Sequence, residues 1–240
     1  MVAARAHETM TRTAVIAGVG PGLGESLARK FIDEGCQVGL FARSTGYLEE
    51  LSADLGEHAV AVPTDITDEQ RVEDAFDEVR EAFGSVDILV NHASGAAWKG
   101  LRDISSGEFE QAWRVSAQGA LLCSQQAVAD MDDGGTIIFT GATSAVRGRD
   151  GAVGFSAAKF AVRGMAESMA RELGPEGIHV AHVVLDGQIN TPTLRRQNPN
   201  RDEDSLLDPD EIAESYWHLV EQDETAWTLE LDLRPAVEDF

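Results

Sequence analysis

The sequence predicts an α/β fold in which helices cover both faces of one doubly wound parallel sheet of about seven strands. Short apolar runs alternate along the chain with segments whose apolar residues recur every three or four positions, and these patterns are typical of buried strands and of one-faced helices. No linker, repeat or change of composition divides the 240 residues. We therefore expect a single domain over residues 13–240, preceded by a flexible leader at residues 1–12.

Each expected strand is a short apolar run bounded by polar or turn-forming residues. In chain order the runs are residues 13–18, 37–42, 59–63, 87–91, 136–140, 179–185 and 225–232. Because helical patterns separate consecutive runs, we expect the strands to pair in parallel.

Apolar spacing defines the helices between these strands. Leu23, Leu27 and Phe31 share one face of a first helix, which ends at Gly35. Further helices are expected over residues 46–55, 68–83, 154–173 and 210–221.

A capping box marks the start of one more helix. Ser105 and Glu108 have the required spacing, and the pattern predicts a long helix to about residue 131. Residues 187–208 fit neither pattern and are rich in Asn, Pro, Arg and Asp, so we expect an irregular loop there on the substrate side of the domain.

Composition excludes several classes of protein. The net charge of −23 makes nucleic acid a poor partner, because phosphates would be repelled. The sixteen arginines against three lysines and the scattered acidic residues resemble the surfaces of proteins from salt-loving organisms. No apolar run reaches the length of a membrane span, and Cys36 and Cys123 have no disulfide or zinc pattern. We expect a cytoplasmic protein without membrane, nucleic-acid or metal partners.

A glycine-rich turn follows the first expected strand and opens the first helix. It reads Gly18-Val19-Gly20-Pro21-Gly22-Leu23-Gly24. Glycines let the backbone approach a ligand closely, and the helix start offers free N–H groups to an anion. Gly18, Gly20, Gly22, Leu23 and Gly24 are therefore predicted to hold the pyrophosphate of a dinucleotide.

The spacing Gly18-x-x-x-Gly22-x-Gly24 resembles that of the short-chain dehydrogenase/reductase family, over roughly residues 13–232. Further matches are Asp65-Ile66 after the third strand, Asn91-His92-Ala93-Ser94 after the fourth, and Lys159. Asp186-Gly187 followed by Ile189 and Thr191 resembles the family's Pro-Gly…Thr segment, which holds the nicotinamide carboxamide. The resemblance implies a Rossmann fold, a nicotinamide cofactor held by Asp65, Ile66, Asn91, Lys159, Ile189 and Thr191, and a small-molecule substrate.

The end of the second strand favours NADP(H), with NAD(H) as the alternative. An acidic residue there would bind the adenosine ribose hydroxyls and repel a 2′-phosphate. This chain instead has Arg43 and Ser44, which can donate hydrogen bonds to a phosphate. Arg43 could also simply pair with the surface carboxylates of Glu49 or Glu50.

The catalytic positions implied by the resemblance are mostly changed. The family's tyrosine lies four residues before its lysine, where this chain has Phe155. Ala142 stands at the serine position, with the hydroxyls of Thr143 and Ser144 displaced from it, and Ser116 stands at the asparagine position. Lys159 alone is kept, although in the family it also binds the nicotinamide ribose.

Three hypotheses follow from this pattern. The chain transfers hydride with a substitute proton donor, which could be Ser144, Thr143, His92 or a water on Lys159, or with none. His92 could equally be a residue that lines the cofactor pocket without donating a proton. Alternatively it is a non-catalytic cofactor-binding sensor or structural subunit, or Lys159 is itself the acid/base of another reaction. We favour the first, and regard Tyr216 as a remote further candidate.

Two surface features bear on partners. The pair Arg195-Arg196 in the expected loop could attract an anionic substrate, although charge balance on the surface explains it better. Small residues on more than one face of the helices expected at 105–131 and 154–173 permit close packing, and the family often pairs these helices across a two-fold axis. We expect a homodimer or homotetramer.

Overall fold

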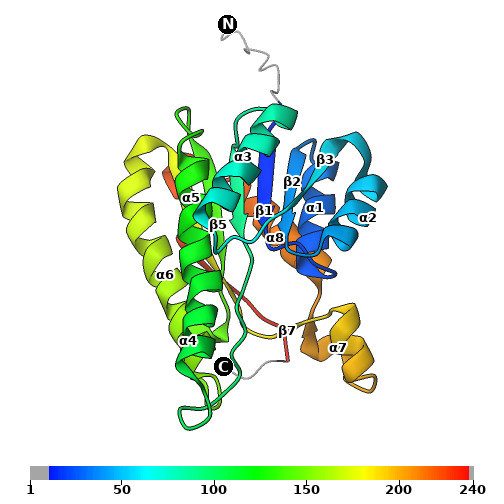
Figure 1. The fold of residues 1–240 in the computed structure, drawn as a ribbon, viewed down its shortest axis with the longest axis vertical. Helices are drawn as coiled ribbons and strands as arrows, with labels where there is room; N and C mark the ends of the chain where they lie inside the picture. Colours follow the sequence, from blue (N-terminus) through cyan, green and yellow to red (C-terminus); the bar gives the residue numbers. More distant parts are fainter. Residues whose placement is uncertain (1–10, 238–240) are drawn as a thin grey trace, which may run out of the picture.

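A seven-stranded parallel sheet forms the centre of the computed structural model, which describes residues 11–237 (Figure 1). The strand order is β3-β2-β1-β4-β5-β6-β9, and every neighbouring pair is parallel. The strands are β1 Thr13–Ala17, β2 Gln37–Ala42, β3 Ala59–Pro63, β4 Ile88–Asn91, β5 Gly135–Thr140, β6 Ile178–Leu185 and β9 Glu230–Leu233. The predicted α/β fold is confirmed. The strand order reverses between β1 and β4, the point at which sheets of this kind bind ligands.

Helices cover both faces of this sheet, as the continuous apolar runs of its central strands require. On one face the core contains side chains from α1 Leu23–Asp33, α2 Thr45–Leu55 and α8 Pro209–Val220. On the other face it contains side chains from α3 Glu69–Phe83, α5 Gly119–Val128 and α6 Val153–Leu173. Ala14 and Ile16 of β1 point to the first core, whereas Val15 and Ala17 point to the second.

The long helix predicted from residue 105 to about 131 is interrupted. The capping box of Ser105 and Glu108 is present and opens α4, Ser106–Trp113. A π-helical turn, Arg114–Gln118, then separates α4 from α5. Ser116 lies within this turn, and π turns of this kind are frequent at functional sites.

The segment 187–208 is not the irregular loop that we expected. Gln188–Ile189 (β7) pairs with Leu206–Leu207 (β8), and α7, Pro192–Gln197, lies between them. The hydroxyl of Thr191 accepts a hydrogen bond from the Leu194 amide and so caps α7, a signal that the expectation missed. Figure 1 shows α7 beyond the carboxyl ends of the strands, on the side where the candidate site lies.

The last strand also begins later than predicted. The carboxylate of Asp223 accepts from the Thr225 amide and caps a 3₁₀ turn, Glu224–Ala226, so β9 starts only at Glu230. Both cysteines are free and buried. Within residues 11–237, no helix combines the length and the apolar character needed to cross a bilayer.

Candidate functional site

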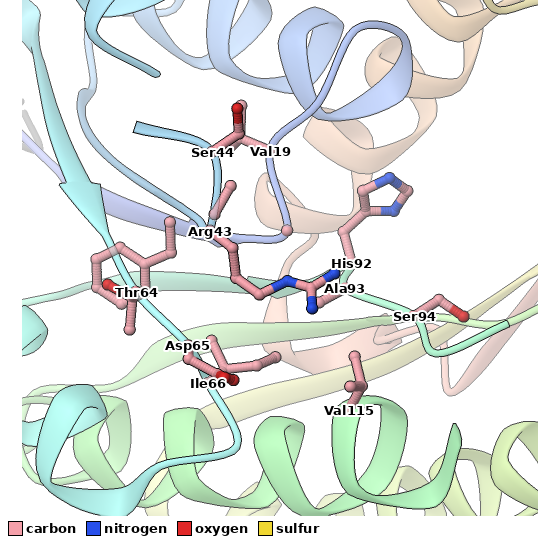
Figure 2. A pocket seen from close by; sticks show the side chains of 13 residues that line it. Val19, Arg43, Ser44, Thr64, Asp65, Ile66, His92, Ala93, Ser94 and Val115 are labelled. Carbon is pink, nitrogen blue, oxygen red and sulfur yellow. The ribbon is translucent and has the colours of Figure 1, made fainter. Parts of the chain in front are cut away.

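A pocket of about 440 Å³ opens at the carboxyl ends of β1, β2, β3 and β4 (Figure 2). Its walls come from the glycine-rich turn, the ends of β2 and β3, and the segment after β4. The lining residues are Gly18, Val19, Phe41, Ala42, Arg43, Ser44, Thr64, Asp65, Ile66, His92, Ala93, Ser94 and Val115. Of the residues predicted to hold the cofactor, five line this pocket, namely Gly18, Arg43, Ser44, Asp65 and Ile66. The others do not line it, namely Gly20, Gly22, Leu23, Gly24, Asn91, Lys159, Ile189 and Thr191.

The glycine-rich turn needs its glycines. Gly18 and Gly22 have φ values of +115° and +135°, which other residues rarely adopt. A Cβ on Gly18 would lie 2.3 Å from the Ala93 nitrogen, and one on Gly22 would lie 2.8 Å from the Thr191 Cγ2. In the described part of the chain, no side chain caps the helix that begins at Leu23. The turn therefore packs backbone against both neighbouring segments and leaves the start of α1 open to an anion.

Arg43 extends across this pocket toward Ala93, with Asp65 and Ile66 on the opposite wall (Figure 2). Within residues 11–237 its guanidinium forms no hydrogen bond or ion pair, so it does not pair with Glu49 or Glu50. The Asp65 carboxylate accepts bonds from the amide and hydroxyl of Thr67, at 3.0 and 2.8 Å. The hydrogen bond from the Thr67 amide is the main cause that lowers the pKa of Asp65, and it acts against partial burial. The bond from the Thr67 hydroxyl and the charge of Arg43 lower this pKa further. A free cation and an ionised carboxylate thus share this end of the pocket.

Asn91 and His92 point in different directions. The Asn91 amide donates to the Ser124 hydroxyl at 3.1 Å, inside the helix layer, and does not line the pocket. The His92 ring turns away from Arg43 (Figure 2), and its Nδ1 lies 3.2 Å from the Thr140 hydroxyl. Burial, aided by the charge of Lys159, lowers the pKa of His92 to about 4. His92 is therefore neutral near pH 7.

Lys159 is almost fully buried, at 3% exposure. Its Nζ donates to the Thr140 carbonyl at 2.8 Å and lies 5.8 Å from the centre of the Phe155 ring. Burial lowers the pKa of Lys159 to about 8. The ammonium is held at the end of β5, on the side of the sheet that α6 covers.

A second cavity of about 400 Å³ lies beside Phe155. Its walls combine the turn after β5, the start of α6 and the β7–α7 segment. The lining residues are Trp98, Ala142, Thr143, Ser144, Arg149, Phe155, Leu185, Gly187, Gln188, Ile189, Thr191, Thr193, Leu194 and Gln197. Trp98 covers the Phe155 ring, with the two ring centres 4.5 Å apart.

The hydroxyls in this cavity differ in their hydrogen bonds. Ser144 Oγ is buried and has no partner within the described residues. Thr143 instead donates to the Asp186 carboxylate at 2.5 Å, and that carboxylate also pairs with Arg147 and Arg234 at 3.5 and 3.3 Å. The Ser144 hydroxyl is thus buried and unengaged within the described residues, whereas the Thr143 proton is already engaged.

The remaining candidates lie further from this cavity. Ser116 Oγ accepts from the Gly95 amide at 3.0 Å and does not reach Lys159. Arg195 bonds to Asn190 and Glu203, at 2.6 and 2.9 Å, which supports charge balance over substrate attraction. No group of three or more metal-ligating side chains occurs in the part of the chain that the structure describes.

Sequence reasoning missed several residues of the site. Thr140 contacts Lys159, His92 and Tyr216, and its only sequence signal was its place at the end of a predicted strand. Trp98 is 58% exposed although it is large and apolar, and it lies in a glycine- and alanine-rich stretch that carried no periodic pattern. Asp186 was noted only for its place before Gly187.

Comparisons with known proteins agree with this geometry. A family model described as short chain dehydrogenase matches residues 12–202. An uncharacterised oxidoreductase of Staphylococcus aureus (strain N315) is 27% identical over 228 residues, which cover 94% of this chain and 97% of the relative. A 3-ketoacyl-(acyl-carrier-protein) reductase from Brucella melitensis, solved in complex with NADH, is similar with a TM-score of 0.83, 27% identity and coverage of 94% and 97%. A mutant short-chain dehydrogenase/reductase of Serratia marcescens is similar with a TM-score of 0.84 and 25% identity, and the match covers 94% of this chain and 98% of the mutant enzyme.

Proposed function

The chain belongs to the short-chain dehydrogenase family, and on that premise we propose that it is an NADP(H)-dependent oxidoreductase acting on a small carbonyl or alcohol without a tyrosine acid/base. The observation that carries the proposal is the pocket at the carboxyl ends of β1–β4, where the glycine-rich turn, the start of α1 and Arg43 meet; among residues 11–237 no side chain caps that helix and none pairs with Arg43. The Brucella reductase, similar over 94% of this chain, is a complex with NADH, which supports nicotinamide binding here.

Arg43 is the reason to prefer NADP(H). A guanidinium that lines the pocket without a carboxylate partner is available to a 2′-phosphate. NAD(H) lacks that phosphate, so it would leave this charge without an interaction.

The second cavity is the proposed substrate site. When bound, the nicotinamide supplies or accepts the hydride. Ile189 and Thr191 line this cavity where they could hold the carboxamide end of the cofactor, and Thr191 contacts Gly22 of the cofactor turn. Phe155 and Trp98 form an apolar wall that would exclude water from the reacting carbon.

Ser144 is the residue best placed to bind the substrate oxygen, because it lines this cavity and its hydroxyl has no partner among residues 11–237. A serine hydroxyl orients a carbonyl but is not an acid near neutral pH, so we propose that the proton comes from water. Lys159, held behind Phe155, keeps the cofactor role of the family lysine. Loss of a general acid typically costs about 10²- to 10⁴-fold in rate.

A sensor or structural subunit is the second candidate function. The contact of Phe155 with Trp98 favours it, because an aromatic pair occupies the place where the family has its proton donor. Such a protein would bind NADPH without turning over any substrate.

The deciding experiment is a titration with NADPH and NADH in buffer containing molar salt, followed by bound-nicotinamide fluorescence, and then addition of a panel of ketones and aldehydes. Tighter binding of NADPH with slow oxidation supports the oxidoreductase. Binding without turnover, in wild type and in Phe155→Tyr, supports the sensor. If neither nucleotide binds, both proposals are wrong.

We also propose that the chain assembles as a homodimer or homotetramer through α4, α5 and α6. These helices expose large apolar side chains, namely Phe109, Trp113, Leu121 and Phe160. Light scattering during size-exclusion chromatography measures the assembly, and Trp113→Glu should lower its mass. A wild-type monomer would contradict the proposal.

A further inference from the structure

Three polar side chains, the buried Tyr216 and Thr140 and the partly buried His92, form a hydrogen-bonded series behind the cofactor pocket. The Tyr216 hydroxyl, on α8, lies 2.9 Å from the Thr140 hydroxyl at the end of β5. The Thr140 hydroxyl in turn lies 3.2 Å from Nδ1 of His92, just beyond β4. This hydrogen-bonded series therefore links a helix on one face of the sheet to a residue that lines the pocket.

The direction of the hydrogen bonds follows from the number of available acceptors. Tyr216 is fully buried, and within residues 11–237 its hydroxyl has Thr140 as its single partner. If Tyr216 donates, Thr140 is free to donate to His92, and both hydroxyl protons are bonded. If His92 donated to Thr140 instead, the two hydroxyls would have only their mutual contact left among the described residues, so one of their two protons would be buried without an acceptor, which is costly.

His92 must then accept through Nδ1 and carry its proton on Nε2. That second nitrogen has no partner within the described part of the chain and is not sealed off by protein, and the residue lines the pocket. We propose that Tyr216 and Thr140 fix His92 as the neutral Nε2–H tautomer, so that it serves as a permanent hydrogen-bond donor to an oxygen of the bound dinucleotide. This inference rests on the proposed binding of a dinucleotide.

The charges around His92 support a role as a hydrogen-bond donor to the cofactor and argue against a role as the proton donor of the reaction. Lys159 on α6 and Arg43 across the pocket are cationic, Tyr216 is neutral, and Asp65 lines the far wall. Burial and the Lys159 charge keep the pKa of His92 at about 4. His92 is therefore a positioning residue for the cofactor and not the proton donor that its type suggested from sequence.

The tautomer is measured directly by ¹⁵N NMR of histidine-labelled protein, with His92→Gln used to assign the signals among the six histidines. We expect an unprotonated Nδ1 and a protonated Nε2 that do not change between pH 5.5 and pH 8. A predominant Nδ1–H form, or a titration near the ordinary pKa of about 6.5, would overturn the inference. This measurement needs neither substrate nor cofactor.

Binding tests the second half of the inference. His92→Phe keeps a ring but has no donor, and should weaken NADPH binding by about tenfold, the usual effect of one lost hydrogen bond to a polar oxygen. His92→Gln keeps an amide donor and should bind more tightly than His92→Phe. Thr140→Val should weaken binding as His92→Phe does, whereas Thr140→Ser keeps the hydroxyl and should bind as wild type does.

Tyr47→Phe is the matched control, because it removes the other tyrosine hydroxyl, which bonds to Glu25 outside the pocket. It should bind NADPH as wild type does, and thermal unfolding checks that each variant is folded. Equal affinity of wild type and folded His92→Phe would overturn the inference and leave the proposed function standing. Failure of wild type to bind either nucleotide would overturn the donor role together with the proposed function.

Discussion

Replacing Phe155 by tyrosine would place a phenol beside the buried ammonium of Lys159. The Lys159 nitrogen lies 5.8 Å from the centre of the Phe155 ring. With the ring centre taken as the position of the phenolate charge, two unit charges attract each other by about 3 kcal/mol at an effective dielectric constant of about 20. This attraction would lower the phenol pKa from about 10 to about 8. Burial of the ring opposes the change, so we expect a phenol pKa between these two values.

Ultraviolet absorbance of tyrosinate during a pH titration measures the ionisation of this phenol, with little contribution from the two native tyrosines. Burial raises the pKa of Tyr216, and burial together with the hydrogen bond to Glu25 raises that of Tyr47. Both native tyrosines therefore stay protonated over the pH range in which the phenol at position 155 is expected to titrate. Lys159 and the new phenol will titrate as a coupled pair, and the absorbance reports the pair.

Phe160→Tyr is the control, because Phe160 follows Lys159 on the same helix but is 43% exposed. Its phenol should titrate near the ordinary value of about 10. A Phe155→Tyr phenol that titrates at or above the control would refute the reasoning, because the lysine charge would then not act on position 155. If the pKa falls as expected, carbonyl reduction should rise by about 10²- to 10⁴-fold over wild type.

Three further outcomes follow from single features of the structure. Arg43→Gln should weaken NADPH binding by about tenfold or more and leave NADH binding unchanged; an equal loss for both nucleotides in the fluorescence titration would contradict the role of Arg43. Burial lowers the pKa of Lys159 to about 8 from 10.5, so the unfolded chain holds this proton more tightly, and the free energy of unfolding should rise by up to about 3 kcal/mol as pH increases through that window. Urea unfolding at pH 7 and pH 10 tests this, since Lys159→Met should lack that rise; a difference between the two proteins that does not change with pH would argue against a buried lysine of low pKa. Finally, the net charge of −23 should make the unfolding temperature rise by several degrees between about 0.1 M and about 1 M KCl, because salt shortens the Debye length and screens the repulsion. Sucrose, an uncharged stabilising solute, is the control; a rise in KCl no larger than the rise in sucrose would show that repulsion between charges is unimportant.

The sheet and the phosphate-binding turn could be predicted because each depends on local sequence. Apolar runs located the first six strands of the main sheet to within about one residue, whereas the start of the last strand was predicted five residues too early. The positive φ values of Gly18 and Gly22 are features that only glycine adopts easily, so the motif itself carries the geometry.

Features that depend on distant contacts could not be predicted. The π turn at Ser116 lies within a pattern that reads as one continuous helix, and nothing local marks it. Asn91 is the last residue of a strand, where a cofactor ligand would be expected, yet its amide bonds to Ser124, 33 residues away. In the hydrogen-bonded series, Tyr216 and Thr140 are 76 residues apart and Thr140 and His92 are 48 residues apart, and no local pattern encodes such contacts.

Thr140 explains why a lysine can be kept after its tyrosine is lost. Its carbonyl accepts from Lys159, and its hydroxyl connects Tyr216 with His92, so one residue at the end of β5 joins groups from both faces of the sheet. Removing Lys159 would leave a buried carbonyl without its donor and also remove the charge that helps to keep His92 neutral. The lysine therefore has a structural and a cofactor-positioning reason to remain, and neither requires a phenol at position 155. The retained lysine thus supports cofactor binding by this chain more strongly than it supports the proton transfer of the family.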